Sequence, residues 1–162
     1  MYRKISALVA VAAVAAITAA LLAGGATARS TIKHQRVAIV LNDTASTFTL
    51  TPLTPGPVKQ DSGAFTACCW INRDIARDGL SVSLGNPRLT FKGNRGTFSW
   101  RGQLTFVDLD NGYTVATAQW EIIGGTGAYA HLEGHGRQAF VEMTNEGDIL
   151  ANKAEGLVAL GR

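Results

Sequence analysis

The sequence predicts an all-β fold: a single antiparallel up-and-down barrel of about eight strands, closed or nearly closed, over residues 36–162. Apolar and polar residues alternate in several segments, which is typical of strands with one buried face. Turn signals separate these segments, and no segment sustains a helical apolar stripe over three turns. A meander of consecutive strands hides both of its edges by closing, so these observations together favour a barrel.

Residues 1–28 have the pattern of a secretory signal peptide. Two basic residues precede an apolar run over residues 5–23, and an Ala-x-Ala site ends at Ala28. We predict cleavage after Ala28 and secretion of the remainder. The alternative is an uncleaved membrane anchor, because the run is near the lower length for a bilayer span. Residues 29–35 are predicted to form a flexible lead to the barrel.

The charge of the chain gives no sign of a nucleic-acid partner. Without residues 1–28 the protein keeps 13 basic and 12 acidic residues, a net charge of +1 with the two signs mixed along the chain. A nucleic-acid-binding domain normally carries a clustered positive surface. We therefore expect no nucleic acid as a partner, and no membrane once the leader is removed.

The N-terminal half of the barrel contains the shorter predicted strands. Alternation begins at Val37 and again at Phe48, with an Asn-Asp turn between them. Three prolines within residues 52–57 exclude a central strand there and predict an irregular connection. A further strand is predicted over residues 64–72, and residues 74–79 are expected to form one helical turn or a loop.

The chain has two cysteines, Cys68 and Cys69, which are adjacent. Neighbouring Cα atoms lie about 3.8 Å apart, below the usual range for a disulfide. Two interpretations remain open: a disulfide between neighbours in an exported protein, or a buried pair of small apolar thiols beside Trp70. Redox chemistry is the least expected, because no C-x-x-C motif or activating cation adjoins the pair in the sequence.

The clearest alternation in the chain runs over residues 97–106, followed by an Asp-Asn-Gly hairpin signal at residues 110–112 and a partner strand over residues 113–123. Apolar side chains fall on one face of each strand. The aromatic ones either line a cavity that binds an apolar ligand or fill a solid core; they are Phe98, Trp100, Phe106 and Trp120.

Two carboxylates on these strands are the candidate catalytic residues. Asp108 continues the apolar face at even spacing, so its side chain could point into the barrel mouth; the simpler interpretation is a local hydrogen bond beside the turn, where aspartate is common. Together with Glu121 it could stabilise developing positive charge or move a proton. The sequence contains no recognised catalytic motif of hydrolases or kinases.

A glycine-rich stretch follows the second strand, with the sequence Ile-Ile-Gly-Gly-Thr-Gly-Ala-Tyr over residues 122–129. Glycine permits backbone angles and close approaches that a Cβ would resist, so we predict a sharp structural corner between two strands. Its residues are Gly124, Gly125, Thr126 and Gly127. The stretch lacks the residues of a phosphate loop or a dinucleotide fingerprint. Further strands are predicted up to Met143 and from Leu150 to Leu160.

This corner resembles the Ile-x-Gly-Gly-Thr-Gly-x-Tyr/Phe corner of the allene oxide cyclase-like and dirigent-like β-barrels, and the resemblance covers residues 89–136 best. After the corner, residues 130–133 depart from the dirigent pattern. The resemblance implies a small barrel, commonly trimeric, that cyclises or steers apolar molecules without a metal or organic cofactor. We therefore expect a cofactor-independent cyclase, isomerase or dirigent-like protein. The alternative is a non-catalytic secreted carrier of apolar ligands or an interaction module.

His131, Glu133 and His135 fall on one face of an extended segment after the corner. The first and last lie about 13 Å apart at the rise of a strand, too far for one ion to join both. We predict a solvated polar face and no metal. On the outer face of the neighbouring strands, a more apolar set would suit a subunit contact; it comprises Tyr113, Val115, Val141 and Met143.

Overall fold

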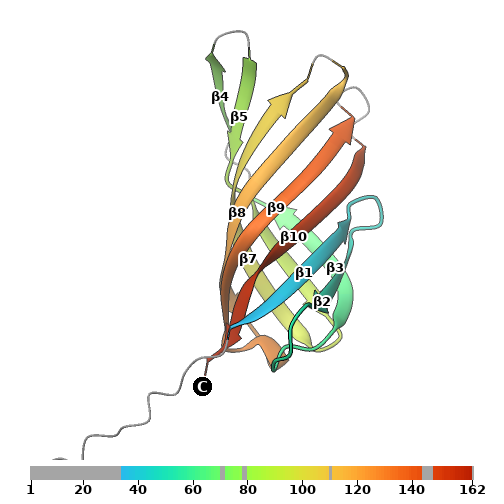
Figure 1. The fold of residues 1–162 in the computed structure, drawn as a ribbon, viewed down its shortest axis with the longest axis vertical. Coiled ribbons are helices and arrows are strands. Elements are labelled where there is room, and N and C mark those ends of the chain that lie inside the picture. The colour runs from blue at the N-terminus through green and yellow to red at the C-terminus, as the bar shows by residue number, and fades with distance from the viewer. Residues whose placement is uncertain (1–33, 70–71, 78–79, 110, 144–147, 162) are drawn as a thin grey trace, which may run out of the picture. The chain divides into compact units, whose positions relative to one another are not determined.

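The computed structural model describes residues 34–69, 72–77, 80–109, 111–143 and 148–161 (Figure 1). The predicted leader and nearly all of the predicted lead fall outside these residues. The described elements are β1 (Gln35–Asn42), β2 (Thr47–Pro52), β3 (Asp61–Cys68), β4 (Asn72–Arg77), β5 (Leu80–Gly85), β6 (Arg88–Gly93), β7 (Gly96–Asp108), β8 (Tyr113–Gly125), η1 (Gly127–Tyr129), β9 (Leu132–Met143) and β10 (Ile149–Leu160). Within the described residues, no helix is long and apolar enough to cross a membrane.

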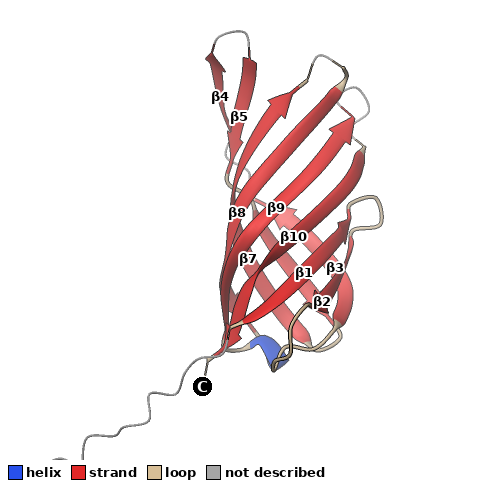
Figure 2. Cartoon of the chain, viewed as in Figure 1, coloured by secondary structure: helices blue, strands red, loops and turns tan. Residues whose placement is uncertain are grey.

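The strands form a closed antiparallel barrel with eight strand positions and one extra strand. Seven positions are held by β1, β2, β3, β7, β8, β9 and β10. The eighth is shared by β5 and β6, which pair with successive parts of β7. The circle closes where β10 pairs with β1. The other neighbours follow the order of the chain, except that β3 pairs with β6 and skips the β4–β5 hairpin. The predicted all-β barrel is confirmed (Figure 2).

Residues 72–77 form β4, so the predicted helical turn or loop was wrong there. This strand pairs along its whole length with β5, for example Asn72 with Gly85. A short charged segment carries no clear periodic signal, and its pairing with a neighbour decides its conformation. In Figure 1 the β4–β5 hairpin projects from one end of the barrel.

The side chains of the long strands alternate as the sequence predicts. In β8, Ala116, Ala118 and Trp120 are buried, whereas the residues between them are exposed. The hairpin between β7 and β8 also lies where it was predicted, and Gly112 in its turn has φ +84°. This positive φ is accessible to glycine at little cost, which explains the residue at this position.

The strands differ in length, and this difference distinguishes the two ends of the barrel. β1, β2, β3 and β6 have 6 to 8 residues, whereas β7 to β10 have 12 or 13. The long strands therefore extend past the short ones at one end. We call the inner face of this end the mouth and the opposite end, where η1 lies, the closed end (Figure 2).

The glycine corner lies at the closed end and joins β8 to β9 through η1. Gly127 has φ +59°, in the left-handed region that favours glycine. A Cβ on Gly125 would collide with the carbonyl oxygen of Tyr129. The corner also bonds to the β6–β7 turn: the Ala128 N–H donates to the Arg95 carbonyl at 2.9 Å. These contacts fix the corner against a second turn of the closed end.

A buried carboxylate completes the closed end. Asp61 is 5% exposed and accepts a hydrogen bond from the Tyr129 hydroxyl at 2.8 Å. It also accepts bonds from the main-chain N–H groups of Ser62, Asn94 and Arg95, at 2.8, 3.1 and 3.2 Å. Burial, and then the hydrogen bond to Asp61, raise the pKa of Tyr129. The phenol therefore remains a proton donor to the carboxylate.

Candidate functional site

The mouth has an apolar floor built from small and large side chains on three long strands. Leu104, Ala116, Ala118 and Phe140 are buried and form a cluster of their own, separate from the main core. Phe106 packs against this cluster, and its ring lies 5.7 Å from that of Phe140. Ala116 on β8 is a small side chain whose neighbours across the sheet are Phe106 and Phe140. The four side chains of the cluster are nearly fully buried, and Phe106 at the edge of the cluster is partly exposed.

A chain of polar side chains lies beside this cluster, level with Ala118 and Phe140 in the strand register. The Gln138 amide nitrogen donates to Oδ1 of Asn152 at 2.7 Å, and the Asn152 amide nitrogen donates to Oδ2 of Asp43 at 2.9 Å. Gln138 and Asn152 are each only 6% exposed. They come from β9 and β10, and Asp43 comes from the β1–β2 turn. Barrel closure brings these three residues together.

The surroundings of Asp43, at the end of this chain, change the pKa of its carboxyl group. Burial raises the pKa of Asp43, and the hydrogen bond from Asn152 offsets part of that effect. Desolvation disfavours the charged form of a carboxylate. Asp43 therefore holds a proton more readily than an aspartate in water, and it could exchange that proton with a bound molecule.

Asp108 lies at the edge of the same mouth. Its place in β7 is in phase with Leu104 and Phe106, and it pairs across the sheet with Thr114. The Thr114 hydroxyl donates to Oδ1 of Asp108 at 2.6 Å, and the Asp108 side chain is exposed. Asp43 is thus half-buried, whereas Asp108 lies at the solvent edge of the mouth.

The four predicted ligand-binding aromatics do not lie in one place. Phe98, Trp100 and Trp120 are at most 2% exposed and belong to the main core. The two indole rings stack at 4.8 Å with an interplanar angle of 19°. Phe106 alone borders the mouth. Three of the four side chains therefore fill the barrel interior, which is one of the two roles that the sequence left open.

The stacked indoles carry an unusual feature. Within the part of the chain that the structure describes, the indole N–H groups of both Trp100 and Trp120 are buried without a hydrogen-bond acceptor. Most buried polar groups in proteins have a partner. Leaving one such donor unpaired costs about 1–3 kcal/mol. The layer beneath the mouth therefore contains two adjacent buried donors without a partner among the described residues.

Glu121 lies on the outer face of β8, not in the mouth. It forms an ion pair with Arg101, which is opposite it on β7. Because side chains alternate along a strand, residues 108 and 121 point to opposite sides of the barrel wall. The structure therefore does not bring Asp108 and Glu121 together as one catalytic pair.

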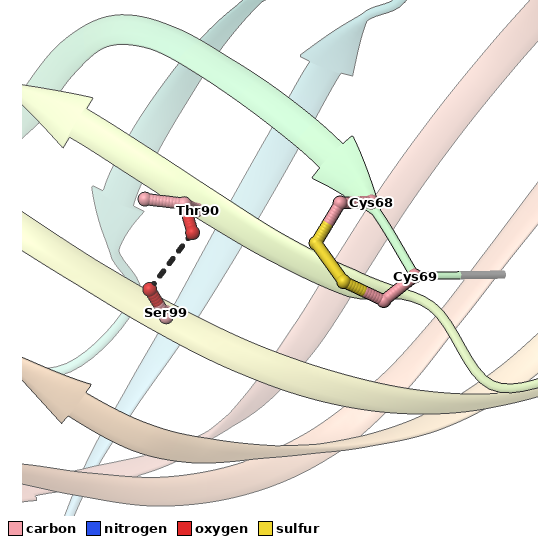
Figure 3. Close-up of a disulfide and its surroundings, with 4 residues drawn as sticks. All are labelled: Cys68, Cys69, Thr90 and Ser99. Atoms are coloured by element: carbon pink, nitrogen blue, oxygen red, sulfur yellow. Dashed lines mark hydrogen bonds between the residues drawn. A yellow bond between two sulfur atoms is a disulfide. The ribbon is translucent and has the colours of Figure 1, made fainter.

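The remaining candidates also lie on the outside. His131, Glu133 and His135 are exposed, and no group of three metal-ligating side chains occurs among the described residues. Cys68 and Cys69 form a disulfide at the exposed end of β3, near the hydrogen-bonded pair Thr90 and Ser99 (Figure 3). Trp70 lies outside the described residues.

The outer face of the long strands contains open hollows as well. The larger one has a volume of about 770 Å³ and crosses β7 to β10. Its lining includes Gln103, Gln119 and Arg137, all exposed. A second hollow of about 670 Å³ adjoins it and shares both glutamines. The larger hollow also reaches Ala118 and Gln138, which belong to the mouth.

Sequence reasoning missed the polar chain of the mouth. Gln138 and Asn152 occupy inward phases of their strands, where a polar residue interrupts an apolar face, and that interruption was the available signal. Asp43 was interpreted only as part of a turn. The three residues are far apart in the sequence, so only the closed circle of strands shows that they are neighbours.

Comparisons of the chain with protein-family models, curated proteins and solved structures give no match. The resemblance to allene oxide cyclase-like and dirigent-like barrels therefore stays a prediction drawn from the glycine corner and the strand pattern. What the chain binds or does has to be inferred from the mouth itself.

Proposed function

We propose that this protein is a secreted barrel that binds a small, largely apolar molecule in its mouth. The observation that carries the proposal is the buried chain Gln138–Asn152–Asp43 beside the apolar cluster around Phe140. Ligand sites are typically apolar surfaces with a few convergent polar groups that fix orientation. The mouth combines both features within one end of the barrel.

The ligand's apolar body would lie against Ala116, Phe106 and Phe140, and its polar group would bond to Gln138 or Asn152. Amide side chains both donate and accept hydrogen bonds, so this chain can be rearranged around a ligand carbonyl or hydroxyl. The unpaired indole donors of Trp100 and Trp120 further support a ligand that carries an acceptor oxygen.

Binding without catalysis is the form of this function that we favour, because Asp108 and Glu121 lie on opposite faces. A cofactor-independent cyclase or isomerase is the second candidate, and the raised pKa of Asp43 supports it. Such an enzyme would hold a flexible substrate in a folded conformer while a carboxyl group moves a proton. The resemblance to allene oxide cyclase-like barrels supports the same alternative.

The binding proposal can be tested with the fluorescent probe 1-anilinonaphthalene-8-sulfonate and with dodecanoic acid as a competitor. We expect the wild-type protein to bind the probe and dodecanoic acid to displace it. Gln138→Leu should weaken binding of the acid about threefold to tenfold, since one hydrogen bond is lost. Gln103→Leu, on the outer face, is the matched control. Equal affinities for both variants, or no probe binding, would contradict the proposal.

Variants of Asp43 and Asp108 distinguish a non-catalytic carrier from an enzyme. With a molecule that displaces the probe, Asp43→Asn and Asp108→Asn should leave affinity within about threefold under both forms. If the protein is an enzyme, conversion of that molecule should slow in at least one of them. A molecule that is bound and recovered unchanged after long incubation with the wild-type protein supports the carrier.

Self-association is part of the proposal, and the resemblance suggests a trimer. The outer face near the mouth has a row of apolar residues in register: Val107, Val115 and Val141. Tyr113 and Leu109 beside it are 38% and 41% exposed. Light scattering at high micromolar concentration tests this part, and a monomeric mass would contradict it.

A further inference from the structure

The disulfide between Cys68 and Cys69 does not serve as a staple for the fold. A cross-link stabilises a protein mainly by closing a loop in the unfolded chain, and the effect grows with loop length. A bond between neighbours closes no loop of that kind. Both residues are exposed, so the bridge also contributes little to the core. The role of the disulfide is therefore better sought in the reactivity of its sulfur atoms than in stabilisation of the fold.

A cation faces this bridge from the next strand. Arg88 on β6 lies directly opposite Cys68 in the β3–β6 register. Side chains at such positions share a face, with Cβ atoms about 4.5–5.5 Å apart. Arg101, opposite Arg88 on β7, is already paired with Glu121. Among the described residues no carboxylate forms an ion pair with Arg88, and the strand register places this residue beside Cys68.

The backbone at the bridge is also unusual. Cys69 has φ +66°, in the left-handed region that residues with a Cβ rarely occupy. Exposure, an opposing cation and a constrained backbone together describe a site at which thiolate chemistry is favoured. The sequence could not show this, because the cation is supplied by a strand that is not adjacent in the chain.

We propose that Cys68–Cys69 is a redox-active disulfide that exchanges with a dithiol reductant. A thiolate of the reductant attacks Sγ of Cys69, and the S–S bond breaks with its electron pair on Sγ of Cys68, beside Arg88. The second thiol of the reductant then attacks the mixed disulfide and releases Cys69. The pair gains two electrons and two protons, and the reductant leaves as a disulfide.

The rate of reduction tests this proposal, with dithiothreitol as the probe and the whole protein purified without reducing agent. Iodoacetamide and mass measurement count the free thiols. We expect no label before reduction and two labels after it. Arg88→Gln should slow reduction about threefold to tenfold at low salt, since a cation stabilises the leaving thiolate. Arg36→Gln, another exposed arginine far from the bridge, is the matched control and should leave the rate unchanged.

A second measurement separates this role from a structural one. In Cys69→Ser, the pH dependence of alkylation reports the pKa of the single thiol of Cys68. We expect this pKa below the ordinary value of about 8.5, and a rise when Arg88→Gln is added. Two labels without reductant would show that no bridge forms. Equal reduction rates and equal thiol pKa values with and without Arg88 would overturn the proposal.

Discussion

The two ends of the barrel both bury polar groups, but they satisfy them in different ways. At the closed end, three of the four donors to Asp61 are main-chain N–H groups, two of them in the β6–β7 turn. In the mouth, Gln138, Asn152 and Asp43 bond to one another through side chains only. A network anchored on backbone cannot change without moving the turns. A chain of side chains can open around a ligand and leave the strands in place.

The apolar side chains of the two ends also differ, because large aromatic rings are more frequent near the closed end than in the mouth. The half of the barrel nearer the closed end contains stacked and edge-on aromatic rings. For example, the ring centroids of Phe91 and Phe98 lie 4.6 Å apart. The mouth has alanines at the corresponding inward positions of β8, and only Phe106 and Phe140 are large aromatics in its cluster. One half of the barrel is therefore richer in packed aromatic rings than the other, which supports the proposal that the mouth is the binding end.

The largest expected effect is at the closed end. Gly125→Ala should lower the free energy of unfolding by about 3 kcal/mol, the upper end of the cost of overpacking, because the new Cβ meets the Tyr129 carbonyl oxygen. Gly112→Ala is the control at the mouth, where a Cβ has open space and only the positive φ resists it. We expect about 1 kcal/mol there. Thermal melting measures both, and equal losses would remove the contrast between the ends.

A smaller loss is expected when the closed-end network loses one donor. Tyr129→Phe leaves the buried carboxylate of Asp61 without its hydroxyl donor, and such bonds to charged groups contribute about 1.5–3 kcal/mol. Urea unfolding of the variant should show a lower midpoint with an unchanged slope. Tyr113→Phe, an exposed tyrosine on β8, should leave the midpoint unchanged. A Tyr129→Phe variant as stable as the wild-type protein would show that the network is not a structural anchor.

The mouth should tolerate the loss of a hydrogen bond better. Gln138→Leu deprives Asn152 of a donor and should cost about 1 kcal/mol, which is less than the loss from Tyr129→Phe. The same urea experiment gives the comparison. If Gln138→Leu were the more damaging of the two, the polar chain of the mouth would be the structural network and its proposed role in binding would fail.

The smallest effect concerns pH. The pKa of Asp43 is raised above its ordinary 3.8, so the folded protein binds this proton more tightly than the unfolded chain does. Stability from this group therefore falls as pH rises from 3.8 through the raised pKa. Asp43→Asn removes that fall. We expect equal melting temperatures for the two proteins near pH 3 and a higher one for Asp43→Asn at pH 7; the opposite order would contradict the assignment.

The sequence predicts the closed half and the long strands well because local chemistry determines them. Alternation in β8 and the Asn-Gly turn act over a few residues, and Gly127 has the positive φ that a glycine-rich stretch suggests. The prediction of a helical turn or loop was wrong over residues 72–77, because the strand conformation there depends on pairing with β5. Local patterns contain no information about such a partner.

The candidate site was predicted only in part, for a related reason. Asp108 was identified because it extends a local alternation, and it does lie at the mouth in phase with Phe106. Asp43 and the cation opposite Cys68 were not identified, because each becomes significant only through a residue on another strand. Glu121 was included for its charge, although the same alternation places it outside.

Closure of the barrel by its first and last strands determines the order in which it can fold. Gln35 of β1 pairs with Val158 of β10, so this seam joins opposite ends of the described chain. Hairpins such as β7–β8 need only neighbouring residues and can form early, whereas the seam carries the largest cost of loop closure. Until β10 has been synthesised, β1 and β9 each present an unpaired edge that another chain could join. The last twelve strand residues therefore protect a nascent barrel from aggregation as well as completing its wall.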